Sequence, residues 1–167
     1  LVPEMRYSEL AQRGAKGDQR IEISNSNTGE RTIATANSRD ESPLRISDGP
    51  DVAHYTVVEN SFEVSQKSFW QSHKDAPATL TKAVLEYAGT REGDQVLDLY
   101  GGVGLFTAAL LPLVGESGSV DLVEGSKFAT SDATRNFANA KNVNIVTGDV
   151  AKVITRFPRA DVVVLEP

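Results

Sequence analysis

The sequence predicts an α/β fold, in which a small antiparallel β module precedes a parallel sheet whose first four strands are present. Three observations lead to this prediction. From residue 95 onward, short apolar runs alternate with segments of helical periodicity. A glycine-rich bend at residues 101–104 joins the first of these strands to a helix. Before residue 70, short alternating runs separated by turn residues are typical of antiparallel strands.

The N-terminal part contains the expected antiparallel module, which we assign to residues 1–66. Apolar and polar residues alternate in 20–24 and again in 31–35, with turn residues between, which predicts a β-hairpin. The stretch 36–51 is rich in Ser, Asp, Pro and Gly, so we expect a loop there. Two further short strands are expected, and they are residues 53–58 and 61–65.

The second expected domain comprises residues 67–167. It begins with an amphipathic helix over 75–89, with Asp75 as its candidate N-cap and Gly89 as its C-terminal stop. Strands and helices then alternate, which predicts right-handed crossovers in a parallel sheet covered on both faces. The expected strands are 95–100, 119–124, 143–147 and 161–165, and the expected helices are 105–111, 127–140 and 150–157. Because only Glu166 and Pro167 follow the last strand, we expect the chain to be part of a longer protein.

Composition limits the possible functions. The formal net charge is −6 and the basic residues do not cluster, so charge alone does not predict a nucleic-acid binder. The chain contains no cysteine, which excludes thiolate metal sites and thiol nucleophiles from it, and we expect no metal site. No apolar run approaches the roughly 20 residues that a membrane span requires, and no signal peptide is recognisable. We therefore expect a cytoplasmic protein that does not bind membranes.

The candidate ligand site is the bend between the strand at 95–100 and the helix that follows. Glycines there let a ligand lie against the main chain. A dinucleotide-binding bend would have a third small residue where this sequence has Thr107. Asp98, just before the bend, would repel a pyrophosphate but suits a ligand that carries an ammonium and a sulfonium group. These residues favour S-adenosylmethionine over NAD as the cofactor.

Two more acids follow neighbouring strands. Glu124 ends the second strand, where its carboxylate can accept hydrogen bonds from ribose hydroxyls. Asp149 follows the third strand, where it can meet the adenine amino group, cap the helix that begins near residue 150, or do both. The carboxyl ends of parallel strands share one edge of a sheet, so we expect Asp98, Glu124 and Asp149 to lie together.

Several segments occur in an informative order: residues 62–65, 68–71 and 73 precede residues 96–106, which are followed by Glu124 and Asp149. In this order they resemble the RNA uracil-5-methyltransferases, which make 5-methyluridine in tRNA or rRNA. The Phe-Trp-Gln segment upstream of Leu-Asp-Leu-Tyr is more specific to that family than the glycine bend is. The resemblance covers residues 53–167 well and the hairpin more loosely. It rests on residues 62–65, Ser68 to Gln71 and His73, on residues 96–106, on Val123 and Glu124, and on Asp149.

The resemblance implies a Rossmann-like class I methyltransferase sheet with S-adenosylmethionine as cofactor. It implies that Gln71 contacts the methionine end of the cofactor, that Glu124 holds the ribose and that Asp149 lies by the adenine. The family has an Asp-Pro-Pro-Arg-like motif after the fourth strand, where this sequence has Glu166 and Pro167. The full set of expected cofactor-binding residues is Gln71, Asp98, Tyr100, Gly102, Gly104, Leu105, Glu124, Asp149 and Glu166.

The resemblance also implies the chemistry of methyl transfer. Family members attack carbon 6 of uracil with a cysteine thiolate and then remove a proton from carbon 5 with a carboxylate base. Both groups are expected beyond Pro167, so we expect no catalytic residue in this chain, inactivity of the chain by itself, and weak or no RNA binding by it. The full-length protein would bind tRNA or rRNA. His54 and His73 are interpreted as surface or capping residues.

Aromatic residues have two possible roles here. Phe69 and Trp70 could stack on a base or adenosine, although packing is equally expected for Trp70 and more expected for Phe69. Phe128 and Phe137 recur at helical spacing and are expected in the core. Alternative functions remain a methyltransferase with another substrate and a non-catalytic S-adenosylmethionine-binding module. Asp98 and Thr107 disfavour a nicotinamide-dependent dehydrogenase.

Overall fold

In the computed structural model, the structure describes residues 19–24, 31–36 and 44–166. An N-terminal three-stranded antiparallel sheet contains β1 (Gln19–Ser24), β2 (Arg31–Ala36) and β3 (Leu44–Asp48). The pairing of β1 with β2 confirms the predicted hairpin, whose turn lies outside the described residues.

Strand β3 corrects the prediction of a loop over 36–51. Leu44 to Asp48 pair with β2 in antiparallel register, with a shift between Ile33 and Ala34. The alternation of Leu44 and Ile46 with polar residues is short, and the Ser, Asp and Pro residues around it favour a loop. An available neighbouring edge, rather than local composition, makes this segment a strand.

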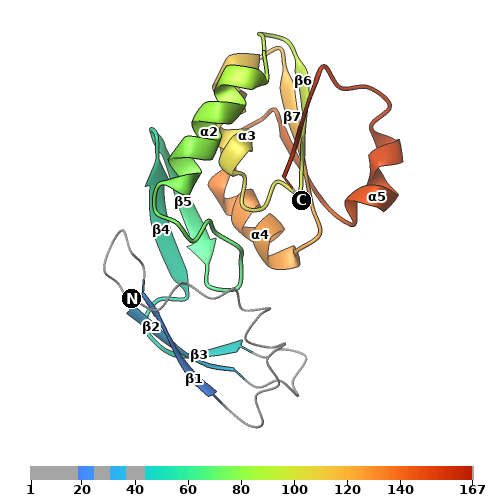
Figure 1. Ribbon diagram of the computed structural model, residues 1–167. Helices are drawn as coiled ribbons and strands as arrows, with labels where there is room; N and C mark the ends of the chain where they lie inside the picture. Colours follow the sequence, from blue (N-terminus) through green and yellow to red (C-terminus); the bar gives the residue numbers. More distant parts are fainter. Residues whose placement is uncertain (1–18, 25–30, 37–43, 167) are drawn as a thin grey trace.

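A second, two-stranded sheet follows. Strand β4 (Val52–Val57) pairs in antiparallel register with β5 (Asn60–Ser65), as the sequence predicted. Val58, in the tight turn between them, has a left-handed backbone with φ of 55°. The antiparallel module therefore comprises two small sheets, which lie one below the other in Figure 1.

The predicted parallel sheet is present, with strand order β8-β7-β6-β9. Its strands pair in parallel along their lengths. The strands are β6 (Gln95–Leu99), β7 (Ser119–Glu124), β8 (Val143–Thr147) and β9 (Val162–Leu165). The helices are α2 (Ala76–Tyr87), α3 (Leu105–Val114), α4 (Lys127–Asn136) and α5 (Val150–Val153), and α5 is followed by the 3-10 turn Ile154–Arg156.

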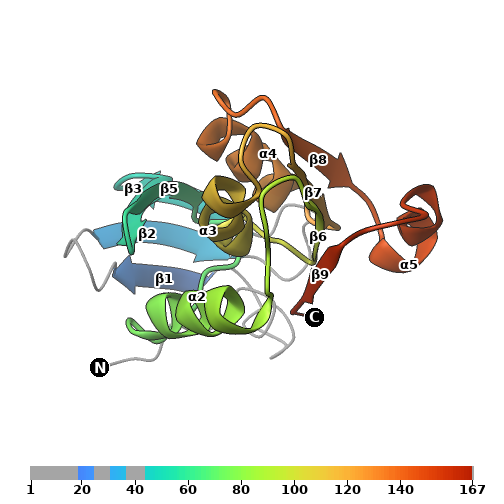
Figure 2. The same cartoon turned by 90° about the horizontal axis from the view of Figure 1, so that it is seen from above.

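Helices cover both faces of this sheet, as Figures 1 and 2 show. Helices α2, α3 and α4 lie on one side, where their apolar residues pack with Val96, Val120 and the buried residues of β5. The short α5 lies on the other side, where Val150 and Val153 pack against Leu97 and Leu99. Alternate residues of β6 thus enter two separate cores, as expected of a strand buried on both faces.

Three helix boundaries differ from the prediction. Helix α3 continues to Val114 and includes Pro112, whereas the expected helix ended at 111. Helix α4 ends at Asn136 rather than 140, and α5 is a single turn that tightens into a 3-10 turn. Asp75 does precede α2, but its side chain makes no capping hydrogen bond. The tertiary contacts at these ends decide the lengths, because helical periodicity alone does not specify where a helix stops.

Candidate functional site

The bend after β6 has an unusual backbone. Tyr100, Gly102 and Gly104 all have left-handed conformations, with φ of 59°, 56° and 95°. A Cβ on Gly104 would lie 2.2 Å from the ring of Phe137, so a side chain is excluded there. A Cβ on Gly102 would meet no atom within 4 Å, so this glycine leaves main chain open to a ligand.

Asp98 lies directly beneath this bend and is 1% exposed. Its Oδ2 accepts hydrogen bonds from the backbone N–H and the hydroxyl of Thr107, at 3.0 Å and 2.6 Å. Its Oδ1 has no hydrogen-bond partner among the described residues. Burial raises the pKa of Asp98 to about 6; the Thr107 hydrogen bonds oppose this shift, and the negative charges of Glu166 and Glu124 add to it.

Glu124, at the end of β7, fastens the bend from the neighbouring strand. Its Oε2 accepts a hydrogen bond of 3.1 Å from the backbone N–H of Gly102, and its Oε1 accepts one of 2.7 Å from that of Ser126. A carboxylate has about four lone-pair positions, so two further hydrogen bonds remain available to ribose hydroxyls.

Gln71 and Glu166, 95 positions apart in the sequence, meet in the structure. The side-chain N–H of Gln71 donates a 2.9 Å hydrogen bond to Oε1 of Glu166. Gln71 belongs to the connection between β5 and α2, while Glu166 follows β9. The charges of Glu166 and Glu124 both act on Asp98, so the three carboxylates occupy the same edge of the sheet.

The other predicted site residues lie around this edge. Tyr100 is exposed at the bend, whereas Leu105 is buried in the core at the start of α3. Asp149 is exposed and caps α5, since its Oδ1 accepts a 3.0 Å hydrogen bond from the backbone N–H of Ala151. Helix capping by Asp149 is therefore confirmed, and its contact with an adenine stays a prediction.

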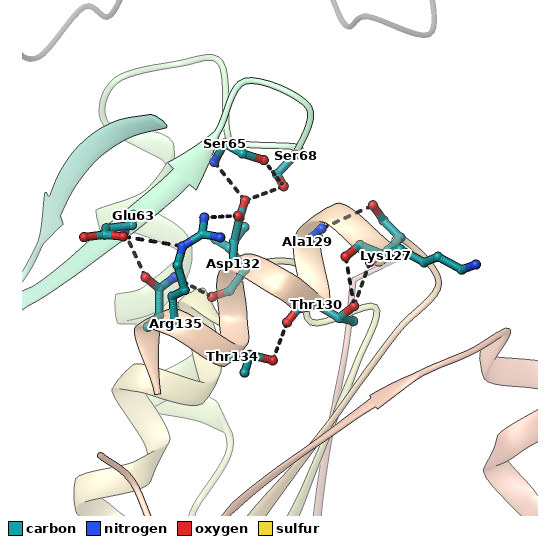
Figure 3. Close-up of polar contacts among 12 residues, drawn as sticks. Glu63, Ser65, Ser68, Lys127, Ala129, Thr130, Asp132, Thr134 and Arg135 are labelled. Atoms are coloured by element: carbon teal, nitrogen blue, oxygen red, sulfur yellow. Dashed lines mark hydrogen bonds and ion pairs between the residues drawn. The ribbon is translucent and has the colours of Figure 1, made fainter. Parts of the chain in front are cut away.

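Asp132, a buried residue of α4 that is 1% exposed, was not predicted from the sequence. Figure 3 shows its carboxylate between two elements: Oδ2 accepts from the backbone N–H of Ser65, at 2.8 Å, and from the hydroxyl of Ser68, while Oδ1 pairs with Arg135. Arg135 also lies 3.5 Å from Glu63. The sequence feature that could have indicated this residue is an aspartate on the helix face that was expected to pack in the core.

The aromatic residues differ from expectation in two places. Trp70 packs in the core, stacked on Tyr55 at a centroid distance of 4.5 Å and tilted against Phe62. Phe69, expected to pack, is 51% exposed. Phe128, expected in the core, is 49% exposed, so that prediction is wrong, whereas Phe137 does pack against the core.

The geometry fits a cationic nucleoside without phosphate. Among the described residues, neither Glu124 nor Glu166 forms an ion pair, and Asp98 retains an unpaired buried oxygen. Three carboxylates next to an open glycine bend would repel a pyrophosphate and attract an ammonium or sulfonium group. Together with the strand order, these features are those expected of a Rossmann-like S-adenosylmethionine-dependent methyltransferase.

The family comparison agrees with this class. The chain belongs to the family described as "Protein-L-isoaspartate(D-aspartate) O-methyltransferase (PCMT)", which it matches over residues 52–162. Membership in a methyltransferase family confirms the predicted cofactor, S-adenosylmethionine. The matched residues extend from β4 to the start of β9 and include the glycine bend.

The names of curated relatives specify RNA, whereas the family description specifies a protein substrate. An "Uncharacterized RNA methyltransferase" from Streptomyces avermitilis is 41% identical over 109 residues, which are 64% of this chain and 25% of the relative. One with a similar name from Corynebacterium diphtheriae is 33% identical over 153 residues, 83% of this chain and 36% of the relative. The chain thus spans about a quarter to a third of the length of these relatives.

A solved structure shares the fold. The Pyrococcus abyssi tRNA (uracil-54, C5)-methyltransferase in complex with S-adenosyl-L-homocysteine has a TM-score of 0.60 and 17% identity, covering 83% of this chain and 41% of that protein. This likeness confirms the predicted α/β fold. Among the described residues, none of the helices has the length and apolar character needed to cross a membrane.

Proposed function

We propose that this chain is the cofactor-binding part of an S-adenosylmethionine-dependent RNA methyltransferase that forms 5-methyluridine in tRNA or rRNA. We further propose that the nucleophilic cysteine and the base are supplied beyond Pro167, since the sequence has no cysteine. The protein would act in the cytoplasm. The curated relatives are named RNA methyltransferases, which supports RNA as the substrate.

One observation carries the uracil-5 proposal: the hydrogen bond between Gln71 and Glu166. The Phe-Trp-Gln segment is the part of the sequence whose resemblance to uracil-5-methyltransferases is more specific than the glycine bend, and Glu166 stands where that family has the acid of its Asp-Pro-Pro-Arg-like motif. Their meeting at the edge that holds Asp98 and Glu124 is what a shared cofactor site requires.

Each residue then has a defined role toward the cofactor. Glu124 would accept from ribose hydroxyls while holding Gly102, and Gln71 with Glu166 would contact the methionine end. Asp98 would stay beneath the bend and contribute negative charge from the interior. The cofactor, when bound, supplies an electrophilic methyl group on a sulfonium; these side chains orient it and offset its positive charge.

Calorimetric titration tests the cofactor assignment. We expect S-adenosylhomocysteine to bind and NAD not to bind; heat with NAD alone would eliminate the methyltransferase assignment. We expect Gln71→Ala to weaken S-adenosylhomocysteine binding by about 1 kcal/mol, because one hydrogen bond is lost. The matched control is Gln66→Ala, in the same connection, whose side chain bonds Thr32 instead of Glu166. Equal affinities for both variants and the wild type would remove Gln71 from the site.

A second candidate function is methyl transfer to a protein carboxyl group, which the description of the matched family favours. The two candidates differ in chemistry, because a carboxylate oxygen attacks a methyl group directly and needs no thiolate. Tritiated S-adenosylmethionine offered to residues 1–167 with an isoaspartyl peptide or a uridine-containing RNA separates them. We expect no transfer to RNA from this chain alone. Turnover of the peptide would establish the second candidate, and turnover of the RNA would refute the argument from the missing thiol.

A further inference from the structure

An exposed aromatic ring and a lysine side chain contact each other away from the carboxylate edge, the edge of the sheet that holds Asp98, Glu124 and Glu166. Phe128 lies in the first turn of α4, and Nζ of Lys67 lies 5.1 Å from the centroid of its ring. Phe128 is 49% exposed, although full burial of such a ring would stabilise the fold by about 1.5–3 kcal/mol. The fold therefore leaves open a ring that intramolecular packing could have covered.

The position of this pair follows from the contacts of α4. Residues four apart lie on the same helix face, so Phe128 lies one turn before Asp132 on the face toward β5. Asp132 bonds Ser68, the neighbour of Lys67, and the same connection continues to Gln71, which bonds Glu166. The pair therefore lies beside the segment that leads into the proposed cofactor site.

Charge favours an anionic, aromatic partner at this place. Among the described residues, neither Lys67 nor Lys127 forms an ion pair, and Figure 3 shows the side chain of Lys127 extending away from the Asp132 contacts. An exposed ring offers a stacking surface to any base, and nearby ammonium groups attract phosphates. The ammonium group over the ring would disfavour the positively charged cofactor at this position.

We propose that Lys67, Phe128 and Lys127 form a docking platform for a single-stranded segment of RNA, with a base stacked on Phe128 and the phosphates attracted by the two lysines. This platform deepens the proposed function and rests on it, because it places the nucleic acid beside the cofactor edge. The platform offers RNA only one ring and two lysines, and the net charge of −6 opposes binding to a polyanion. The weak binding expected of this chain is consistent with both features.

Photo-crosslinking detects such weak binding. Residues 1–167 are irradiated at low ionic strength with a single-stranded oligonucleotide that contains 4-thiouridine, and crosslinked peptides are mapped by mass spectrometry. We expect crosslinks at Phe128 or Lys67, a loss of yield of about fivefold or more in Phe128→Leu, and retention in Phe128→Tyr, which keeps the ring. Lys67→Ala should lower the yield and weaken its dependence on salt.

Matched controls separate the platform from exposed residues in general. Tyr87→Leu removes an aromatic ring that is 80% exposed on α2, and Lys141→Ala removes an exposed lysine beyond α4. Both should leave the crosslinking yield unchanged. Urea unfolding of each variant should match the wild type, because every substituted side chain is exposed.

Calorimetry with S-adenosylhomocysteine distinguishes failure of the platform from failure of the proposed function. Unchanged affinity in Phe128→Leu, together with lost crosslinks, supports the platform. An equal loss of S-adenosylhomocysteine affinity would mean that the ring contacts the adenine of the cofactor, and crosslinks that map elsewhere and survive Phe128→Leu would likewise overturn the platform. In both cases the binding of S-adenosylhomocysteine leaves the methyltransferase assignment intact; its absence in the wild type would refute that assignment separately.

Discussion

Buried Asp98 should make the stability of the fold rise as the pH falls. Its pKa is raised from the ordinary value of 3.8 to about 6, with burial as the main cause. The folded state therefore binds this proton more tightly than the unfolded state does. The resulting stabilisation is fully present below the unfolded pKa and is lost as the pH rises through the folded pKa. Between about pH 7.5 and pH 5, these two pKa values give a gain of about 1.4 kcal/mol from Asp98.

Urea unfolding of the wild type and of Asp98→Asn at these two pH values measures the gain. Asparagine can still accept the hydrogen bonds from Thr107, but its buried amide N–H would lack a partner, which costs roughly 1–3 kcal/mol at every pH. The gain in the free energy of unfolding between pH 7.5 and pH 5 should therefore be about 1.4 kcal/mol smaller in the variant than in the wild type. Asp75→Asn, at an exposed side chain, should keep the behaviour of the wild type. An Asp98→Asn variant that gains as much stability as the wild type on acidification would refute the reasoning.

Further predictions concern the bend, the cofactor and α4. Glu124→Ala should weaken S-adenosylhomocysteine binding by about 1–3 kcal/mol in calorimetry, through lost hydroxyl hydrogen bonds; unchanged affinity would remove Glu124 from the site. The same affinity should fall up to about fourfold between pH 7.5 and pH 5.5, as Asp98 takes up a proton. Gly104→Ala should destabilise the fold by about 2 kcal/mol or more in urea unfolding, because its φ is 95° and Phe137 occupies the space. Asp132→Ala should cost about 2–4 kcal/mol, because the backbone N–H of Ser65 loses its partner and the hydroxyl of Ser68 loses its hydrogen bond to the carboxylate; wild-type midpoints would contradict either expectation.

The parallel sheet could be predicted from the sequence because its strands are short apolar runs, and its central strand β6 is buried on both faces. Apolar runs such as Val162 to Leu165 are separated by helices of the length that right-handed crossovers need. The grouping of Asp98 with Glu124 followed from the same topology, since the carboxyl ends of neighbouring parallel strands coincide. These inferences depend on periodicity and connectivity, and both can be recognised from short stretches of the sequence.

The remaining features depend on contacts between distant segments. Strand β3 exists because β2 offers it an edge, and neither strand specifies that pairing alone. Phe128 has the helical spacing of a core residue, but Ala129 and Thr130 are the buried residues of this turn of α4, and Phe128 is left 49% exposed. Asp132 could be noticed as an acid on an apolar helix face, but its partners, Ser65 and Ser68, lie more than 60 positions earlier.

The β5–α2 connection links these distant contacts to the proposed site. Ser68 is held on α4 by Asp132, and Gln71, three residues later, bonds Glu166 at the end of β9. A connection anchored at both positions cannot shift its glutamine without breaking a buried, charge-assisted hydrogen bond. Asp132 would therefore act at a distance as a positioning residue for Gln71. The antiparallel module would then belong to the cofactor site in a physical sense, because β5 and α4 together fix the segment from which Gln71 reaches the carboxylate edge.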